Sequence, residues 1–332
     1  MKKLIPLLFC FFLFSFTEQK KEMPVCYKAV DQVIWVVADL QNVISQWEKL
    51  GFNQVVMLDD AEMKQVKSGK IARIKVALAN LAGANILLIQ PVKGESVFTK
   101  FHQSYGDGAM SLVHRLDNAK ALQDELERLK GVGLDVYDEI NIKTSQGNLH
   151  YYLMNSREEG KYYLGFVSGN EGLKMREKLT SANLHNMKIN QYAFAISNPE
   201  PVSQFWHRIG LPEFQINHPE LGGKHYYGKT VNHDLIQGWQ RQGTIAYEWC
   251  IPVSTPIVYD DHIKKHGEGI HHLAFTVDNM NKVLDDFTSK SFVVSMGGTW
   301  GTEGKPGFGR YEYIDLEKAG GLTMELLWSY KE

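Results

Sequence analysis

An internal repeat constrains the fold of this chain more than any other feature of its sequence. The stretch from Pro91, PVKGESVFTKFHQSYGDGAMSLVHRLDN, aligns without a gap with the stretch from Pro252, PVSTPIVYDDHIKKHGEGIHHLAFTVDN. Both start with Pro-Val, reach a Gly-acid-Gly turn at the same distance, and end in an apolar strand closed by Asp-Asn. Self-similarity of this kind indicates two copies of one structural unit.

The repeat continues upstream of these stretches. Residues 31–52 and 190–211 each show an alternating strand, a polar break and an amphipathic helix that ends at a glycine, Gly51 or Gly210. The apolar helix residues fall on one face, which predicts helices packed against a sheet. These residues are Val43, Trp47 and Leu50 in the first copy and Val202, Phe205 and Ile209 in the second.

Each copy is itself doubled, because a helical pattern and further strands follow SLVHRLDN and also follow HLAFTVDN. We therefore expect four strand–helix–strands units in an α+β fold, two units in each of two tandem domains. The predicted domains span residues 27–170 and 187–330, and a polar linker at 171–186 joins them, with a short helix expected there.

The N-terminus predicts export. MKK is followed by the apolar run LIPLLFCFFLFSF and then by the polar TEQKKE, as in a secretory signal. The run is short for a membrane-spanning helix, which needs about 20 residues. We expect residues 1–22 to be a signal peptide or an N-terminal anchor, and the protein to be periplasmic, extracytoplasmic or anchored to the membrane. Cys26 and Cys250 are expected to be free thiols.

Composition excludes one class of partner. The 332 residues carry a formal net charge of only −2, without a basic patch that would bind a phosphate backbone. We therefore expect a small-molecule partner and no nucleic acid, and any membrane contact only through the N-terminal segment. The oligomeric state stays open.

Four polar residues stand in otherwise apolar strands of the second domain: Gln191, Glu248, His272 and Glu325. In a pair of units related by approximate two-fold symmetry, equivalent strands approach one central cavity. A buried carboxylate is costly unless it is paired or bound to a cation, so a divalent metal ion would account for the set. The alternative is that each is a solvated strand residue.

The donor types suit Zn, Ni, Co, Mn or Fe rather than an ion that seeks thiolates. Four protein ligands on an octahedral ion leave two positions for substrate or water. Such an ion polarises a carbonyl and stabilises the enolate that follows proton loss, and Glu248 or Glu325 could act as the catalytic base.

These positions, with GEGIHHLAFTVDN and GGLTMELL, resemble the vicinal oxygen chelate superfamily, which includes glyoxalase I, methylmalonyl-CoA epimerase, extradiol dioxygenases and antibiotic-resistance proteins. The resemblance implies paired βαβββ modules that form a curved mixed sheet around a cavity in each domain. It also implies His272, not His271, as a ligand beside Gln191, Glu248 and Glu325. This set is similar to that of glyoxalase I. The dioxygenases of the superfamily use two histidines and one carboxylate, so Gln191 departs from them.

The first domain departs from the implied ligand set. Gln32 matches Gln191, but Leu87, Ser111 and Gly165 replace Glu248, His272 and Glu325. We expect a metal-free copy that serves as a scaffold, a cavity wall or a dimer-like partner, with His114 in a structural role.

The substrate is the least determined feature. Tyr227, Cys250, Arg310 and Tyr313 are candidate cavity residues, and His225, Tyr226, Trp300 and Tyr311 are further possibilities. The Gly-rich stretch 297–310 could form a lid. Export disfavours coenzyme A and glutathione adducts, which leaves a small carbonyl, hydroxy acid, sugar or aromatic compound. We expect a metal-dependent isomerase, epimerase or lyase; the alternatives are a metal-independent binding or resistance protein and an Fe(II) dioxygenase.

Overall fold

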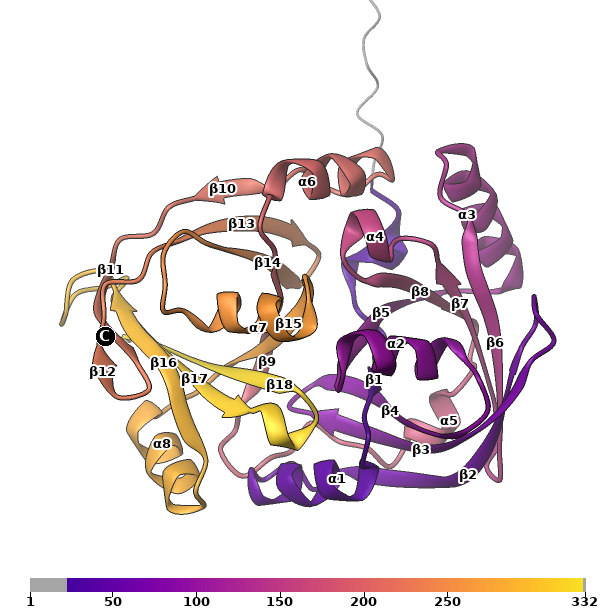
Figure 1. Cartoon of the computed structure of the whole chain (residues 1–332), viewed down its shortest axis with the longest axis horizontal. Helices are drawn as coiled ribbons and strands as arrows, with labels where there is room; N and C mark the ends of the chain where they lie inside the picture. The colour runs from indigo at the N-terminus through magenta and orange to yellow at the C-terminus, as the bar shows by residue number, and fades with distance from the viewer. Residues whose placement is uncertain (1–22, 331–332) are drawn as a thin grey trace, which may run out of the picture.

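The computed structural model describes residues 23–330, apart from the side chains of Asp59, Ile245 and Leu322. The expected signal or anchor at residues 1–22 lies outside the described residues. Two β-rich halves lie side by side, with the N-terminal half in indigo to magenta and the C-terminal half in pink to yellow (Figure 1). Within the described part, no helix combines the length and apolar character that a membrane crossing requires.

The first domain is a closed eight-stranded barrel in the order β1-β4-β3-β2-β6-β7-β8-β5. Its first module contains β1 (Gln32–Val36), α1 (Leu40–Lys49), β2 (Val55–Gln65), β3 (Ile71–Leu81) and β4 (Ala84–Lys93), and α2 (Val97–Tyr105) follows. Its second module contains β5 (Gly108–Leu116), α3 (Ala119–Gly131), β6 (Val136–Thr144), β7 (Gly147–Met154), α4 (Arg157–Gly160) and β8 (Tyr163–Ser168). The modules join at β1–β5 and again at β2–β6, and this second junction closes the barrel.

The second domain has the same plan but stays open as a ten-stranded sheet, β10-β13-β14-β9-β15-β18-β17-β16-β11-β12. Its first module contains β9 (Lys188–Ala195), α6 (Pro199–Arg208), β10 (Gln215–Asn217), β11 (Leu221–Tyr226), β12 (Lys229–Thr230), β13 (Leu235–Gln242) and β14 (Ile245–Pro252). After α7 (Val258–His266) come β15 (Gly269–Thr276), α8 (Met280–Ser289), β16 (Val293–Trp300), β17 (Gly309–Leu316) and β18 (Leu322–Ser329).

The β11–β12 hairpin is an addition that the repeat did not predict. It belongs to the first module of the second domain by sequence, yet β11 pairs with β16 of the second module. The two modules therefore meet along β9–β15 at the centre of the sheet and again at β11–β16, the counterpart of the β2–β6 junction of the first domain. The sheet nevertheless stays open, because its edge strands β10 and β12 do not pair with each other.

The interior of the first barrel is apolar. Apolar side chains from its strands and from α2 pack into one buried cluster, among them Ile34, Leu87, Phe98 and Val113. The barrel closes at β2–β6, so side chains from all around the sheet belong to this one apolar cluster.

Local sequence explains where the helices begin. The Asp-Asn that closes each repeated strand supplies an N-cap, because Asn118 accepts a hydrogen bond from the Ala121 N–H and Asn279 accepts one from the Lys282 N–H. The short helix expected in the linker is α5 (Leu173–Arg176), and Arg176 bonds Asp31 and so ties the linker to the first domain.

Equivalent tryptophans hold the two domains together. Trp47 of α1 donates to the carbonyl oxygen of Ala319 at 3.0 Å, and Trp206 of α6 donates to that of Gly160 at 3.1 Å. Each domain thus offers a helix tryptophan to the loop that precedes the last strand of the other domain. One buried apolar cluster also runs across both domains.

Replacing Trp206 with phenylalanine keeps an aromatic ring but leaves the buried Gly160 carbonyl without its partner. We expect the free energy of unfolding to fall by about 1–3 kcal/mol, measured by chemical denaturation. Trp328→Phe is the control, since Trp328 is only partly buried and packs edge-on against Phe308. An equal decrease in the free energy of unfolding in both variants would contradict a specific interdomain role for Trp206.

His266 makes the domain interface sensitive to pH. Its Nδ1 lies 2.6 Å from the carbonyl oxygen of Tyr105 in the first domain, and its Nε2 lies 3.0 Å from a Glu317 carboxylate oxygen. The bond to Glu317 raises the pKa of His266 above its ordinary value of 6.5. Protonated His266 therefore stabilises the fold fully below pH 6.5, and this contribution disappears as the pH rises through the raised pKa.

We accordingly expect the stability difference between wild type and His266→Gln to be largest below pH 6.5 and to shrink toward pH 9, as measured by denaturation at several pH values. His218→Gln is the control, because its pair with Asp234 is exposed. A difference that does not change with pH would refute the assignment.

Candidate metal centre

The four residues singled out in the sequence converge on one face of the central strands of the second domain. Strand pairing places His272 and Glu248 on either side of Ala193, and Gln191 and Glu325 on either side of Ala274. Alanine side chains between the polar residues leave room for the four larger groups to approach one another.

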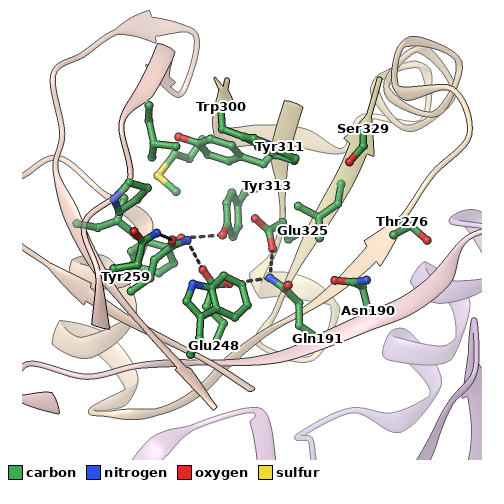
Figure 2. Close-up of a pocket in the computed structure, with 18 residues that line it drawn as sticks. Asn190, Gln191, Glu248, Tyr259, Thr276, Trp300, Tyr311, Tyr313, Glu325 and Ser329 are labelled. Atoms are coloured by element: carbon green, nitrogen blue, oxygen red, sulfur yellow. Dashed lines mark hydrogen bonds between the residues drawn. The ribbon is translucent and has the colours of Figure 1, made fainter. Parts of the chain in front are cut away.

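The donor atoms of the set lie close together. One ligand atom from each of Glu248, His272 and Glu325 falls within 4.8 Å of the other two. Nε2 of His272 is 3.3 Å from Glu325 Oε2 and 3.7 Å from Glu248 Oε2. The Gln191 amide donates to Glu248 at 2.7 Å and to Glu325 at 3.1 Å (Figure 2). All four side chains are buried, and His272 is 0% exposed.

Burial and the short distances within this set shift the pKa values of its ionisable side chains. Removal from water raises the pKa of Glu325 above its ordinary value. Burial also opposes a charge on His272, but the carboxylates of Glu248 and Glu325 outweigh it and raise the pKa of His272 to about 9. The set thus attracts positive charge to the space between the two carboxylates.

The residues fit a divalent cation. His272 Nε2 is buried without a partner in hydrogen-bond geometry, although it faces two carboxylate oxygens. An imidazole nitrogen and two carboxylates aimed at one point, with an amide beside them, match the donors that borderline divalent metals accept in proteins.

His271 lies outside this donor set but supports it. Its Nδ1 is 2.8 Å from Nδ1 of His272, a contact that orients the His272 ring with Nε2 toward the carboxylates. Burial lowers the pKa of His271 well below its ordinary value, so its ring is neutral. The sequence pattern predicts no role for His271, and the structure gives it a positioning contact with His272.

A cavity of about 350 Å³ opens above the candidate metal centre (Figure 2). Its floor contains Gln191, Glu248, Tyr259, Tyr313 and Glu325. The walls are mainly apolar and aromatic, and the mouth is polar. The other lining residues are Asn190, Asn217, Pro219, Leu221, Leu235, Gln237, Trp239, Thr276, Met296, Trp300, Tyr311, Leu327 and Ser329.

The predicted substrate residues divide between the cavity and other places. Tyr313 lines the cavity, as do Trp300 and Tyr311. Arg310 does not, because side chains alternate along β17 and Arg310 lies on the opposite face, bonded to Glu312 and Asn281. Tyr227 lies outside the lining, with its hydroxyl bonded to Asp315.

Cys250 is also outside the lining and is completely buried, and Cys26 and Cys250 are both free thiols. The stretch 297–310, expected as a lid, forms the second half of β16, a turn and the start of β17, and Trp300 is its contribution to the cavity.

Sequence reasoning missed several cavity residues. Gln237 donates to Glu248 at 2.6 Å, and Trp239 follows it on the same face of β13. The hydroxyl of Tyr259 on α7 lies 2.7 Å from that of Tyr313. The repeat contained a signal for Tyr259, because the gapless alignment sets it against the buried Phe98 of the first domain.

The first domain shows the same register without the donors. Ile34 lies between Ser111 and Leu87, as Ala193 lies between His272 and Glu248. Val113 pairs with Gly165 as Ala274 pairs with Glu325. His114 is buried and held by the carbonyls of Ala29 and Cys26, and burial lowers its pKa to about 4.

Comparisons with known proteins agree with this architecture. Residues 190–308 match the family model described as the Glyoxalase/Bleomycin resistance protein/Dioxygenase superfamily. This match confirms the resemblance to that superfamily over residues 190–308, within the second domain. No curated protein shows a significant sequence match.

Two solved structures resemble this chain in fold. A mutant of 4-hydroxymandelate synthase from Streptomyces coelicolor superposes with a TM-score of 0.58 at 11% identity, over 90% of this chain and 92% of that one. A fusion of a xylose isomerase-like TIM barrel with a 4-hydroxyphenylpyruvate dioxygenase superposes with a TM-score of 0.52 at 13% identity. The superposition covers 94% of this chain and 50% of that one. At these identities the likeness shows the fold alone.

Titration with Zn²⁺, Ni²⁺, Co²⁺ or Mn²⁺ should reveal about one ion bound per chain and raise the melting temperature, since an ion that binds only the folded state stabilises it. Glu325→Gln should weaken binding at least about tenfold, because it removes one of the two charges that attract the ion. Glu312→Gln is the matched control: this glutamate is equally buried on β17 but bonds His225 and Arg310. Equal weakening in both variants, or no binding by wild type, would refute the site.

Proposed function

We propose that this protein is a divalent-metal-dependent enzyme that transfers a proton at a carbon next to a carbonyl group, as an isomerase, epimerase or lyase. The observation that carries the proposal is the convergence of Glu248, His272 and Glu325, with Gln191, on the floor of a cavity. Gln191, Glu248, His272 and Glu325 would hold the ion. When bound, it supplies a positive charge that polarises a substrate carbonyl and stabilises the enolate oxygen.

Glu325 is the better candidate for the base. Glu248 is engaged through both oxygens, by Gln237 at Oε1 and by Gln191 at Oε2, which fixes its position. The contacts of Glu325 with Gln191 and His272 both go to Oε2. Burial raises the pKa of Glu325, which makes its carboxylate a stronger proton acceptor than an exposed glutamate.

Two tyrosines could assist the transfer. Burial raises the pKa values of Tyr259 and Tyr313 well above the ordinary value, so both hydroxyls stay protonated. They lie 2.7 Å apart and both line the cavity floor. A neutral hydroxyl there can donate a hydrogen bond to an oxygen on which negative charge develops.

An Fe(II) dioxygenase is the second candidate, supported by the fold shared with the synthase and the dioxygenase fusion. The donor set disfavours a dioxygenase. Two carboxylates, one histidine and one amide stand here, whereas two histidines and one carboxylate are expected of Fe(II) dioxygenases. A metal-independent binding protein would leave the buried carboxylates of Glu248 and Glu325 without a compensating ion.

Solvent-deuterium exchange tests the proposal directly. Metal-loaded wild type should catalyse exchange at the carbon next to the carbonyl of one or more compounds in a panel of small ketones, aldehydes and hydroxy acids, followed by NMR. Glu325→Gln should lower the exchange rate at least about 100-fold, even in samples brought to full metal occupancy. Glu312→Gln should retain the activity.

The competing functions predict other results. Consumption of O₂ dependent on iron and a substrate would establish the dioxygenase. A ligand that binds metal-stripped protein as tightly as metal-loaded protein, with no exchange, would establish the binding protein.

We also propose, from residues 1–22, that the enzyme acts outside the cytoplasm or on a membrane surface. Cell fractionation of the full-length chain tests this, and a purely cytoplasmic distribution would refute it.

A further inference from the structure

The chemistry of the cavity lining narrows the substrate class. Among the described residues that line the cavity, the charged ones are Glu248 and Glu325, and none is lysine or arginine. Of the arginines near the cavity, Arg310 is bonded to Glu312 on the other face of β17, and Arg241 packs over the ring of Trp239 at 4.8 Å rather than joining the lining.

Charge counting then disfavours an anionic substrate. The carboxylates of Glu248 and Glu325 carry two negative charges, which one divalent ion balances. No positive charge remains to compensate a substrate carboxylate or phosphate, and taking an unpaired anion into a largely buried cavity is costly. A neutral substrate meets no such cost.

The mouth of the cavity offers groups that match hydroxyls. Asn190, Asn217, Thr276 and Ser329 are exposed, uncharged and polar, and Figure 2 shows Asn190, Thr276 and Ser329 along one side. Amide and hydroxyl side chains both donate and accept hydrogen bonds, as substrate hydroxyls do. Deeper in the cavity, the hydroxyls of Tyr259 and Tyr313 add two more such groups.

The cavity lining also offers flat apolar surfaces. Trp300 and Tyr311 lie nearly parallel, with an interplanar angle of 18°, and Trp239 also lines the cavity. Aromatic faces contact the C–H side of a small saturated ring well while the polar mouth receives its hydroxyls.

We propose that the substrate is a neutral carbonyl compound with several hydroxyl groups, of the oxo-sugar or ketose type, rather than an anion or a plain aromatic compound. The inference rests on the proposed metal-dependent function and specifies its substrate. It follows from the absence of cations in the lining, the balanced metal centre, and the pairing of neutral polar and aromatic walls.

Calorimetric titration of metal-loaded protein tests the proposal with three probes that share a hydroxyketone group. D-fructose is neutral and polyhydroxylated, D-fructuronate carries a carboxylate in place of the terminal hydroxymethyl group, and 2-hydroxyacetophenone is neutral and aromatic. We expect D-fructose to bind at least about tenfold more tightly than either of the others. Equal or tighter binding of D-fructuronate or 2-hydroxyacetophenone, or no binding of D-fructose at tens of millimolar, would overturn the proposal.

Two substitutions check that the cavity produces the preference. Ser329→Arg places a cation at the mouth and should raise affinity for D-fructuronate about tenfold relative to D-fructose. Ser289→Arg adds the same charge at the exposed end of α8 and should leave the ratio unchanged. If both variants changed the ratio of the two affinities equally, the net charge of the protein and not the cavity would set the preference for a neutral ligand. That result would overturn the proposal.

A prior metal titration separates the two levels of inference. If the protein binds no divalent ion, the proposed metal-dependent function fails. If it binds the ion but does not prefer D-fructose, the metal centre stands and the substrate class alone is wrong.

Discussion

The cost of burying two carboxylates side by side dominates the second domain. Glu248 and Glu325 are 2% and 4% exposed, and each would repel the other across the floor of the cavity without compensation. His272 and Gln191 supply part of that compensation, and a divalent ion would supply the rest. The cavity above the carboxylates would give such an ion access to them.

The two domains share one architecture, but only the second carries these two carboxylates, and their interiors differ accordingly. In the first domain Leu87 occupies the position of Glu248 and joins a continuous apolar interior, and the barrel closes over it through β2 and β6. In the second domain β11 pairs with β16 at the corresponding place, but the sheet stays open between its edge strands β10 and β12. The first domain has an apolar interior, while the second domain has a cavity above the candidate metal centre.

Hydrogen bonds across the interface hold the second domain against the first. Trp206 of the second domain bonds Gly160 of the first, and Trp47 makes the equivalent contact in return. His266, at the end of α7, bonds a carbonyl of the first domain, and α7 also carries Tyr259 to the cavity floor. The helix that delivers a cavity residue is thus anchored to the domain that lacks the donors.

The sequence by itself determined the repeat, the α+β modules and the identity of the donor set. Gapless self-alignment reveals equivalent strand positions, and Glu248, His272 and Glu325 stand out because polar residues in apolar strands need a reason. Only the tertiary structure decided which domain stays open, that Arg310 is outside the cavity, and that Gln237 and Tyr259 are inside it. Those outcomes depend on strand pairing between modules and on which face of a strand turns inward, and both are set by contacts between residues far apart in the chain.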